Sequence, residues 1–128
     1  MRTALIVTAD EGVRARLLRA LEDRSVFSAA SDDDALKTLR LTDVDLIVKD
    51  AETPRRDLPA FLARARQLSP SAVVICLLPD EHGLPDDDDL FESADFLLRR
   101  PFSPRDVATV LRQAEDKQRL MVEVSALR

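Results

Sequence analysis

The sequence predicts an α/β fold in which a parallel sheet of five strands lies between two layers of helices. Along the 128 residues, short apolar runs alternate with segments whose apolar residues recur at helical spacing. The apolar runs are nearly continuous, which is typical of strands that helices cover on both faces. A strand followed by a helix, repeated along the chain, indicates right-handed crossovers and a doubly wound domain of three layers.

The predicted strands are short aliphatic runs at residues 4–7, 25–30, 46–48, 72–78 and 96–98, of which 25–30 is the weakest. Each predicted helix has one apolar face, and these faces begin at Val13, Ala35, Leu58 and Val107. Asp10 is expected to cap the first helix, because Asp is a favoured N-cap residue, and Ser31 opens the second. A further short helix is expected to begin in the acidic run 86–89.

Composition excludes several classes of function. A net charge of −5 and the absence of Trp and Tyr count against nucleic-acid binding by this segment. The longest apolar run, residues 72–78, is too short to span a bilayer, and the single Cys76 allows no internal disulfide. The only glycines are Gly12 and Gly83, so a glycine-rich phosphate loop is missing. Because the N-terminus is not a signal peptide, we expect a cytoplasmic protein. We also expect no cofactor, no membrane partner and no nucleic-acid partner.

Three motifs, taken in their order along the chain, resemble the receiver domain of two-component response regulators. "ALIVTADEGVRARLL" looks like the first strand and helix of that family. "VDLIVKDAETP" looks like the third strand, with Asp50 at the phosphoacceptor position and Pro54 at a loop proline. "ADFLLRRPFSPRDV" is similar to the fifth strand, the basic residue with its proline, and the start of the last helix. The resemblance covers residues 3–115 and implies a flavodoxin-like sheet with strand order 2-1-3-4-5.

The resemblance also implies which positions should carry the family's chemistry. The family uses an acid pair that holds magnesium, the phosphoacceptor, a hydroxyl, a lysine and an aromatic switch residue. Carried over one by one, these positions fall on Thr8 and Ala9, Asp50, Leu78, Arg100 and Leu97. Only Asp50 keeps its identity, and Arg100 keeps the charge but replaces a compact ammonium with a broad planar group.

The substitutions predict a site that has lost its metal. Magnesium needs carboxylate and water oxygens in tight octahedral geometry, whereas Thr8 offers a weak neutral oxygen and Ala9 offers none. Leu78 places an apolar side chain where a phosphoryl oxygen needs a contact. The acid pair Asp10-Glu11 lies one residue too far along the chain to replace the missing acids. We therefore expect no metal, no catalytic residue and no enzymatic activity.

Two geometric expectations follow for the basic residue. The resemblance implies a cis peptide bond between Arg100 and Pro101, because the bond at this position is typically cis in the family. Without a metal, Asp50 is left with Arg100 as its cationic partner, so we expect a contact within about 4 Å.

The C-terminal residues predict a helix that continues past the domain. Residues 115–119 are all polar, which indicates that the helix there has left the sheet, and apolar residues resume at Leu120. A heptad seam would run through residues 107, 110, 114, 117, 121 and 124. We expect one helix of about 35 Å over residues 104–127. The predicted organisation is a receiver-like domain over 1–115 and, over 116–128, an overhanging helix that forms a homodimer and begins the linker to an output module.

The function predicted from the sequence is that of an atypical receiver, which acts through protein–protein interaction and does not switch by magnesium-dependent phosphorylation. Its partner or output domain would bind the last helices and the fifth strand, a surface that carries Arg99, Arg105, Arg112 and Arg119. One alternative is a conventional receiver that a histidine kinase phosphorylates on Asp50, and magnesium binding would separate the two. The other is a small-ligand sensor that uses the same crevice, for which a ligand would raise the melting temperature without magnesium.

Overall fold

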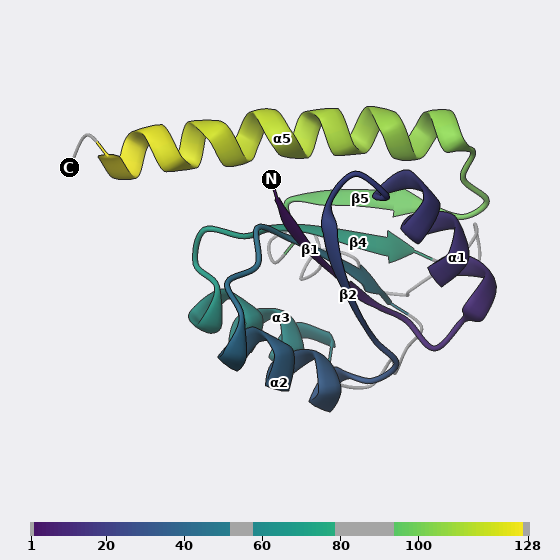
Figure 1. Ribbon diagram of the computed structural model, residues 1–128, viewed down its shortest axis with the longest axis horizontal. Helices are drawn as coiled ribbons and strands as arrows, with labels where there is room; N and C mark the ends of the chain where they lie inside the picture. Colours follow the sequence, from purple (N-terminus) through teal and green to yellow (C-terminus); the bar gives the residue numbers. More distant parts are fainter. Residues whose placement is uncertain (1, 52–57, 79–93, 127–128) are drawn as a thin grey trace.

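The computed structural model describes residues 2–51, 58–78 and 94–126. Its centre is a parallel sheet with the strand order β2-β1-β3-β4-β5, which confirms the predicted fold class and topology. The strands are β1 (Thr3–Val7), β2 (Ser25–Ala29), β3 (Leu46–Asp50), β4 (Val73–Leu78) and β5 (Phe96–Arg99). Because all strands run in the same direction, the sheet has one carboxyl edge and one amino edge (Figure 1).

Helices cover both faces of the sheet. The helices α1 (Glu11–Ala20) and α5 (Pro104–Ala126) lie on one face, and α2 (Asp32–Leu41) and α3 (Leu58–Leu68) lie on the other (Figure 1). The predicted caps are present, because Asp10 accepts hydrogen bonds from the amides of Gly12 and Val13, and Ser31 accepts one from Asp34. Pro54 and the helix expected to begin at residues 86–89 lie outside the described residues.

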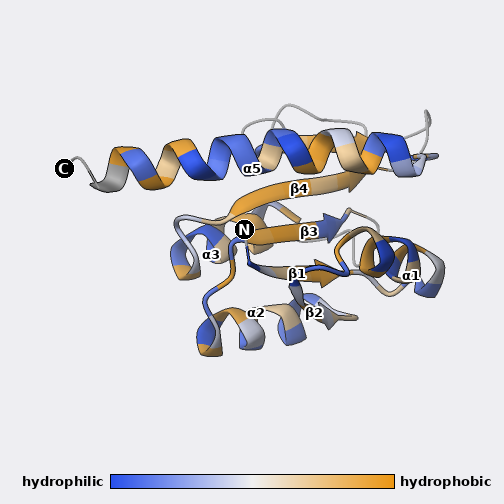
Figure 2. Ribbon diagram, turned by 45° about the horizontal axis from the view of Figure 1, so that its top comes forward, coloured by the Kyte–Doolittle hydropathy of each residue, from blue (hydrophilic) through white to orange (hydrophobic). Residues whose placement is uncertain are grey.

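The strands separate two hydrophobic cores. One core joins the sheet to α2 and α3 and includes Leu5, Ile47 and Phe61, while the other joins it to α1 and α5 and includes Ile6, Leu17 and Leu111. In Figure 2 strand β4 and the first part of β3 are hydrophobic, whereas hydrophilic and hydrophobic residues alternate along α5. Successive strand residues point to opposite faces of the sheet, so each layer of helices buries one set of apolar strand residues.

Helix α5 runs from the carboxyl edge of the sheet past its amino edge, so that its C-terminal end projects beyond the strands (Figure 1). It has 23 residues and is about 35 Å long, in agreement with the prediction. Most of the predicted heptad seam faces the protein's own sheet, because Val107 and Ala114 are buried in the core and Met121 packs against it. No helix in the described part of the chain is long and apolar enough to cross a membrane.

The prediction that α5 leaves the sheet at residues 115–119 is wrong. Glu115 forms an ion pair with Arg24, and Lys117 forms one with Asp95, so this polar stretch still contacts the body of the domain. The prediction assumed that polar residues on a helix face solvent, whereas here they form ion pairs with the domain.

Candidate functional site

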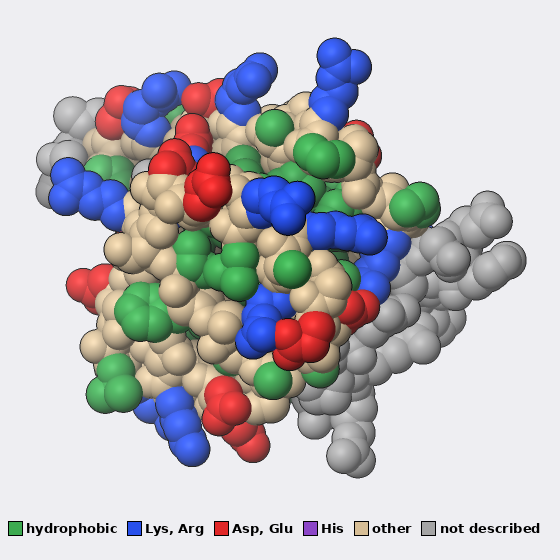
Figure 3. Space-filling view, turned by 45° about the vertical axis from the view of Figure 1, so that its right-hand side comes forward, with side chains coloured by type: hydrophobic (Ala, Val, Ile, Leu, Met, Phe, Trp, Pro, Cys, Tyr) green, Lys and Arg blue, Asp and Glu red, His purple; other side chains and the backbone are tan. Residues whose placement is uncertain are grey.

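The carboxyl edge of the sheet brings together the residues that the sequence singled out. Strand β3 ends at Asp50, β1 is followed by Thr8, β4 ends at Leu78, and Arg100 follows β5. Asp50 pairs in register with Leu77 of the neighbouring strand. The arrangement follows from the topology, since parallel strands deliver the residues at their carboxyl ends to the same edge. In Figure 3, which turns the right-hand side of Figure 1 forward, acidic and basic side chains lie next to one another among hydrophobic ones.

Asp50 is buried and held by two side chains. Its side chain is 1% exposed, and Arg100 Nη2 donates to its Oδ2 at 2.6 Å, which confirms the predicted contact. The hydroxyl of Thr8 donates to the same oxygen at 2.7 Å. Thr8 is itself buried, and its oxygen accepts a hydrogen bond from the amide of Asp10 at 3.0 Å. These charge-assisted bonds are the strong kind, and they fix the carboxylate in one position.

The hydrogen bond from Thr8 was not predicted. From the sequence, Thr8 was expected only to be a poor metal ligand, whereas in the structure it is a donor to Asp50. The available signal was a hydroxyl residue directly after the first strand, because topology places that position beside the end of the third strand.

Asp10 forms the far side of the site. Its Oδ1 accepts from the amides of Gly12 at 2.9 Å and Val13 at 3.2 Å, and its Oδ2 lies 3.5 Å from Arg100 Nη1. The bond from Val13 is the largest effect on its pKa, and with the amide of Gly12 and the charge of Arg100 it outweighs desolvation and lowers that pKa. Arg100 therefore links two carboxylates, and Asp10 is engaged as the cap of α1.

The remaining family positions contribute no oxygen from their side chains. Leu78 is buried in the core that α2 and α3 cover, and Leu97 packs against the same core. Ala9 is exposed. The peptide bond between Arg100 and Pro101 is cis, as the resemblance implied. Within the described ranges, no group of three or more Asp, Glu, His or Cys side chains is placed to hold a metal ion.

A second buried ion pair, which was not predicted, lies on the other side of β3. Lys49 is fully buried, its Nζ lies 2.7 Å from Asp32 Oδ1, and the ammonium lies 5.2 Å from the ring centre of Phe61. Asp32 opens the acidic run at the start of α2, yet its side chain is only 15% exposed because it contacts this lysine. The signal was a lysine inside an apolar strand, since such a cation needs a buried anion.

Cys76 lies beside Lys49 in the sheet register and is buried. Burial raises the pKa of its thiol to about 12, so the group stays protonated at neutral pH. The side chain acts as a small hydrophobic residue in the core, as its place in an apolar run indicated.

No protein-family model matches the chain. The chain is 32% identical over 124 residues to the sensor kinase CckA of Brucella abortus, and the match spans 91% of this chain but only 13% of the kinase.

Solved structures show the same fold. The signal receiver domain of an HD domain-containing protein from Pseudomonas fluorescens superposes with a TM-score of 0.80 and 27% identity, covering 95% of this chain and 92% of that one. A CheY-like response regulator receiver domain protein from Methanospirillum hungatei also gives a TM-score of 0.80, with 22% identity, over 94% of this chain and 98% of that one. The fold, the carboxyl-edge position of Asp50 and these similarities lead to one conclusion: the chain has the fold of a response-regulator receiver domain and is similar in sequence to a signal receiver domain.

Proposed function

We propose that this receiver is atypical: it acts by binding other proteins and does not switch by magnesium-dependent phosphorylation. The observation that carries the proposal is the closed contact among Thr8, Asp50 and Arg100. The carboxylate that would accept a phosphoryl group is 1% exposed, and its Oδ2 already takes two short hydrogen bonds. To accept a phosphoryl group on Oδ2, Asp50 would first have to break the hydrogen bonds from Thr8 and Arg100.

Charge balance argues in the same direction. A phosphoryl group carries about two negative charges, and phosphoryl transfer depends on neutralising them and positioning the reacting atoms. At this site Arg100 brings one positive charge, and that charge is shared between Asp50 and Asp10. Thr8 and Ala9 supply none of the carboxylate oxygens that would recruit magnesium. A lost contact in such a preorganised site commonly costs about a hundredfold or more in rate.

The two alternatives find less support. A conventional receiver would need the magnesium ligands that Thr8 and Ala9 replace. A small-ligand sensor that uses this crevice would need a cavity there. The hollow that Asp10 and Arg100 line has a volume of about 230 Å³, and the hollow of about 640 Å³ between α1 and α5 is lined by neither Asp50 nor Arg100. Ligand pockets usually have volumes of about 300–1,000 Å³.

We further propose that the interaction surface includes the projecting end of α5. Leu120, Val122 and Val124 are 56%, 49% and 52% exposed, and three such side chains within five residues favour a protein partner. In the proposed organisation, residues 1–115 form the receiver and residues 116–128 lead toward an output module, with a second copy of the chain as the partner of the helix. Sedimentation velocity at tens of micromolar should then report a dimer that Leu120→Ser/Val124→Ser weakens, while Leu41→Ser on the exposed end of α2 has no effect. A monomer at that concentration would contradict self-association.

The metal part of the proposal is tested by restoring the acids. In the variant Thr8→Asp/Ala9→Asp/Leu78→Thr, magnesium should raise the melting temperature and shift amide signals around Asp50, whereas the wild type should show neither effect. Leu41→Asp/Gln113→Asp is the matched control, since it adds the same charge at exposed positions far from the site. Saturable magnesium-dependent shifts around Asp50 in the wild type would refute the proposal.

A further inference from the structure

The middle of α5 is fastened to the amino edge of the sheet by polar side chains. Glu115 pairs with Arg24, Lys117 Nζ lies 2.6 Å from Asp95 Oδ1, and Gln118 Nε2 donates to the carbonyl of Ser71 at 3.4 Å. These six residues are called the polar clamp below. Arg24 precedes β2, Ser71 lies between α3 and β4, and Asp95 directly precedes β5, so the clamp joins α5 to three separate segments.

Asp95 is the centre of the clamp. Its side chain is 6% exposed, and its Oδ2 accepts from the amide of Val74 at 2.7 Å and from Arg66 Nη2 at 3.0 Å. Burial raises the pKa of Asp95, but the bonds from Lys117 and Val74 and the charge of Arg66 outweigh it and lower that pKa. The ammonium of Lys117 also lies 5.8 Å from the ring centre of Phe96. One carboxylate thus connects α3, β4 and α5.

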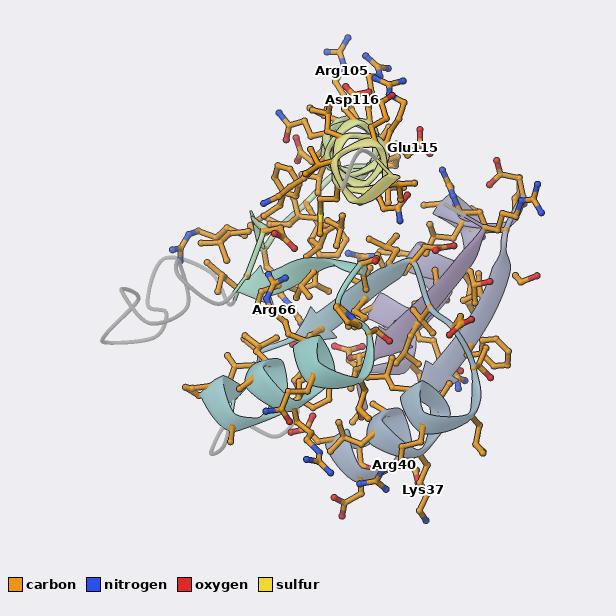
Figure 4. The ribbon with its side chains drawn as sticks, turned by 90° about the vertical axis from the view of Figure 1, so that its left-hand side faces the viewer. Lys37, Arg40, Arg66, Arg105, Glu115 and Asp116 are labelled. Carbon is orange, nitrogen blue, oxygen red and sulfur yellow. The ribbon has the colours of Figure 1, made fainter. Side chains whose placement is uncertain are left out.

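The same turns of α5 also carry charges that take no part in the clamp. Asp116 pairs with Arg119 at 3.1 Å, and both side chains are largely exposed. Figure 4, viewed from the left-hand side of Figure 1, shows Asp116 and Arg105 on the outer side of α5 and Glu115 on the side near the N-terminal segments. Clamp residues and solvent-facing residues are therefore separated by helix face, and this gives a matched control.

We propose that the polar clamp makes the end of α5 a rigid extension of the domain and sets the direction in which Leu120, Val122 and Val124 are presented. The core ends near Ala114, and beyond it Met121 adds partial burial. Without the clamp, the last turns would fray and swing while residues 104–114 stay packed, because the end of a helix without a packed face is marginal in water. The position of a partner bound to this helix is then set by contacts at the amino edge of the sheet, which is opposite to the edge that carries Asp50.

Amide hydrogen exchange on the intact chain tests this inference. Glu115→Gln/Lys117→Met removes both ion pairs and keeps the side-chain stems, including the stem of Lys117 beside Phe96. Exchange over residues 119–126 should accelerate roughly tenfold. Losing one hydrogen bond to a charged group lowers the free energy of local opening by an amount that corresponds to about a tenfold change in the opening equilibrium. Residues 104–112 should keep the wild-type rate. The control Asp116→Asn/Arg119→Met should leave both segments unchanged.

Two outcomes would overturn the inference: equal exchange in the wild type and the clamp variant, or equal acceleration of both segments, which would make the clamp a general stabiliser. Spin labels at Lys37→Cys and Val122→Cys give a second readout, and their distance distribution should broaden only in the clamp variant. The buried Cys76 does not compete for the label. The part of the inference that concerns a partner rests on the proposed function. A concentration series distinguishes protection by the clamp from protection by a second copy of the chain. Protection from the clamp does not depend on protein concentration, whereas protection by a second copy rises with it.

Discussion

The two edges of the sheet use a buried carboxylate in different ways. At the carboxyl edge, Asp50 is bound by Thr8, which follows the neighbouring strand β1, and by Arg100, which follows β5 two strands away. At the amino edge, Asp95 is bound by Arg66 and Lys117, which lie on helices from opposite faces of the sheet. The first arrangement closes a site, and the second ties a helix to the domain. Under the proposed function, similar chemistry holds the phosphoacceptor carboxylate closed at one edge and fixes α5 at the other.

The largest effect should come from the second ion pair of β3. Asp32→Ala would remove the carboxylate that lies 2.7 Å from the buried ammonium of Lys49, and losing one member of a buried pair costs about 3 kcal/mol or more. Urea unfolding should show this loss, and the apolar double variant Lys49→Met/Asp32→Leu should recover most of it. Asp33→Ala, one residue along on an exposed part of α2, is the control. A cost below about 1 kcal/mol for Asp32→Ala, typical of an exposed pair, would contradict the account.

The next effect should come from Asp50. Asp50→Ala removes one of the two carboxylates that Arg100 contacts, and we expect a loss of about 2 kcal/mol. The loss is less than for Asp32→Ala because Arg100 keeps Asp10 and its side chain is 22% exposed. The double variant Asp50→Ala/Arg100→Met should be more stable than Asp50→Ala alone. An increase in stability on Asp50→Ala would show that the carboxylate is strained and held for chemistry, as in a working phosphoacceptor.

Thr8→Val should have a smaller effect. The substitution keeps the shape and removes one donor to Asp50, which costs about 1 kcal/mol for a hydrogen bond to a charged group with a second donor present. The midpoint of urea unfolding should fall accordingly. An unchanged midpoint would mean that Arg100 alone holds the carboxylate.

The smallest effect concerns pH at the opposite edge. Because the folded state lowers the pKa of Asp95, this group adds stability above the pKa of the unfolded chain, about 3.9, and the contribution is lost as pH falls through the lower folded value. Wild-type stability should therefore fall more steeply than that of Asp95→Asn between about pH 5 and pH 2. Parallel pH profiles of the two proteins would show that the charge of Asp95 does not stabilise the folded state.

Much of the fold could be predicted because local signals agreed with one another. Apolar runs gave the strands, Asp10 and Ser31 marked helix starts, and the alternation of elements gave the layers. Topology then placed Asp50 and Arg100 at one edge, and a buried acid without a metal needs a cation, so their contact was predictable too.

The contacts of charged helix residues could not be predicted in the same way. Glu115 and Lys117 have the spacing of a solvent-facing stretch, and the partner of Glu115 is 91 residues away in sequence. Lys49 lies in an apolar strand and Asp32 lies in an acidic run. Neither local pattern indicates that the two side chains form an ion pair. Partner choice for such side chains is decided by tertiary packing, which a single sequence does not display.

The central claim is tested most directly by offering the wild-type protein a small phosphodonor. The intact chain is incubated with magnesium and acetyl phosphate and followed at Asp50 by mass spectrometry, and the amide spectrum is recorded with beryllofluoride as a phosphoryl mimic. The Thr8→Asp/Ala9→Asp/Leu78→Thr variant serves as the comparison. The account predicts no modification of Asp50 and an unchanged amide spectrum in the wild type. Stoichiometric phosphorylation of Asp50, or saturable magnesium-dependent shifts around it, would contradict the account and make the protein a conventional receiver.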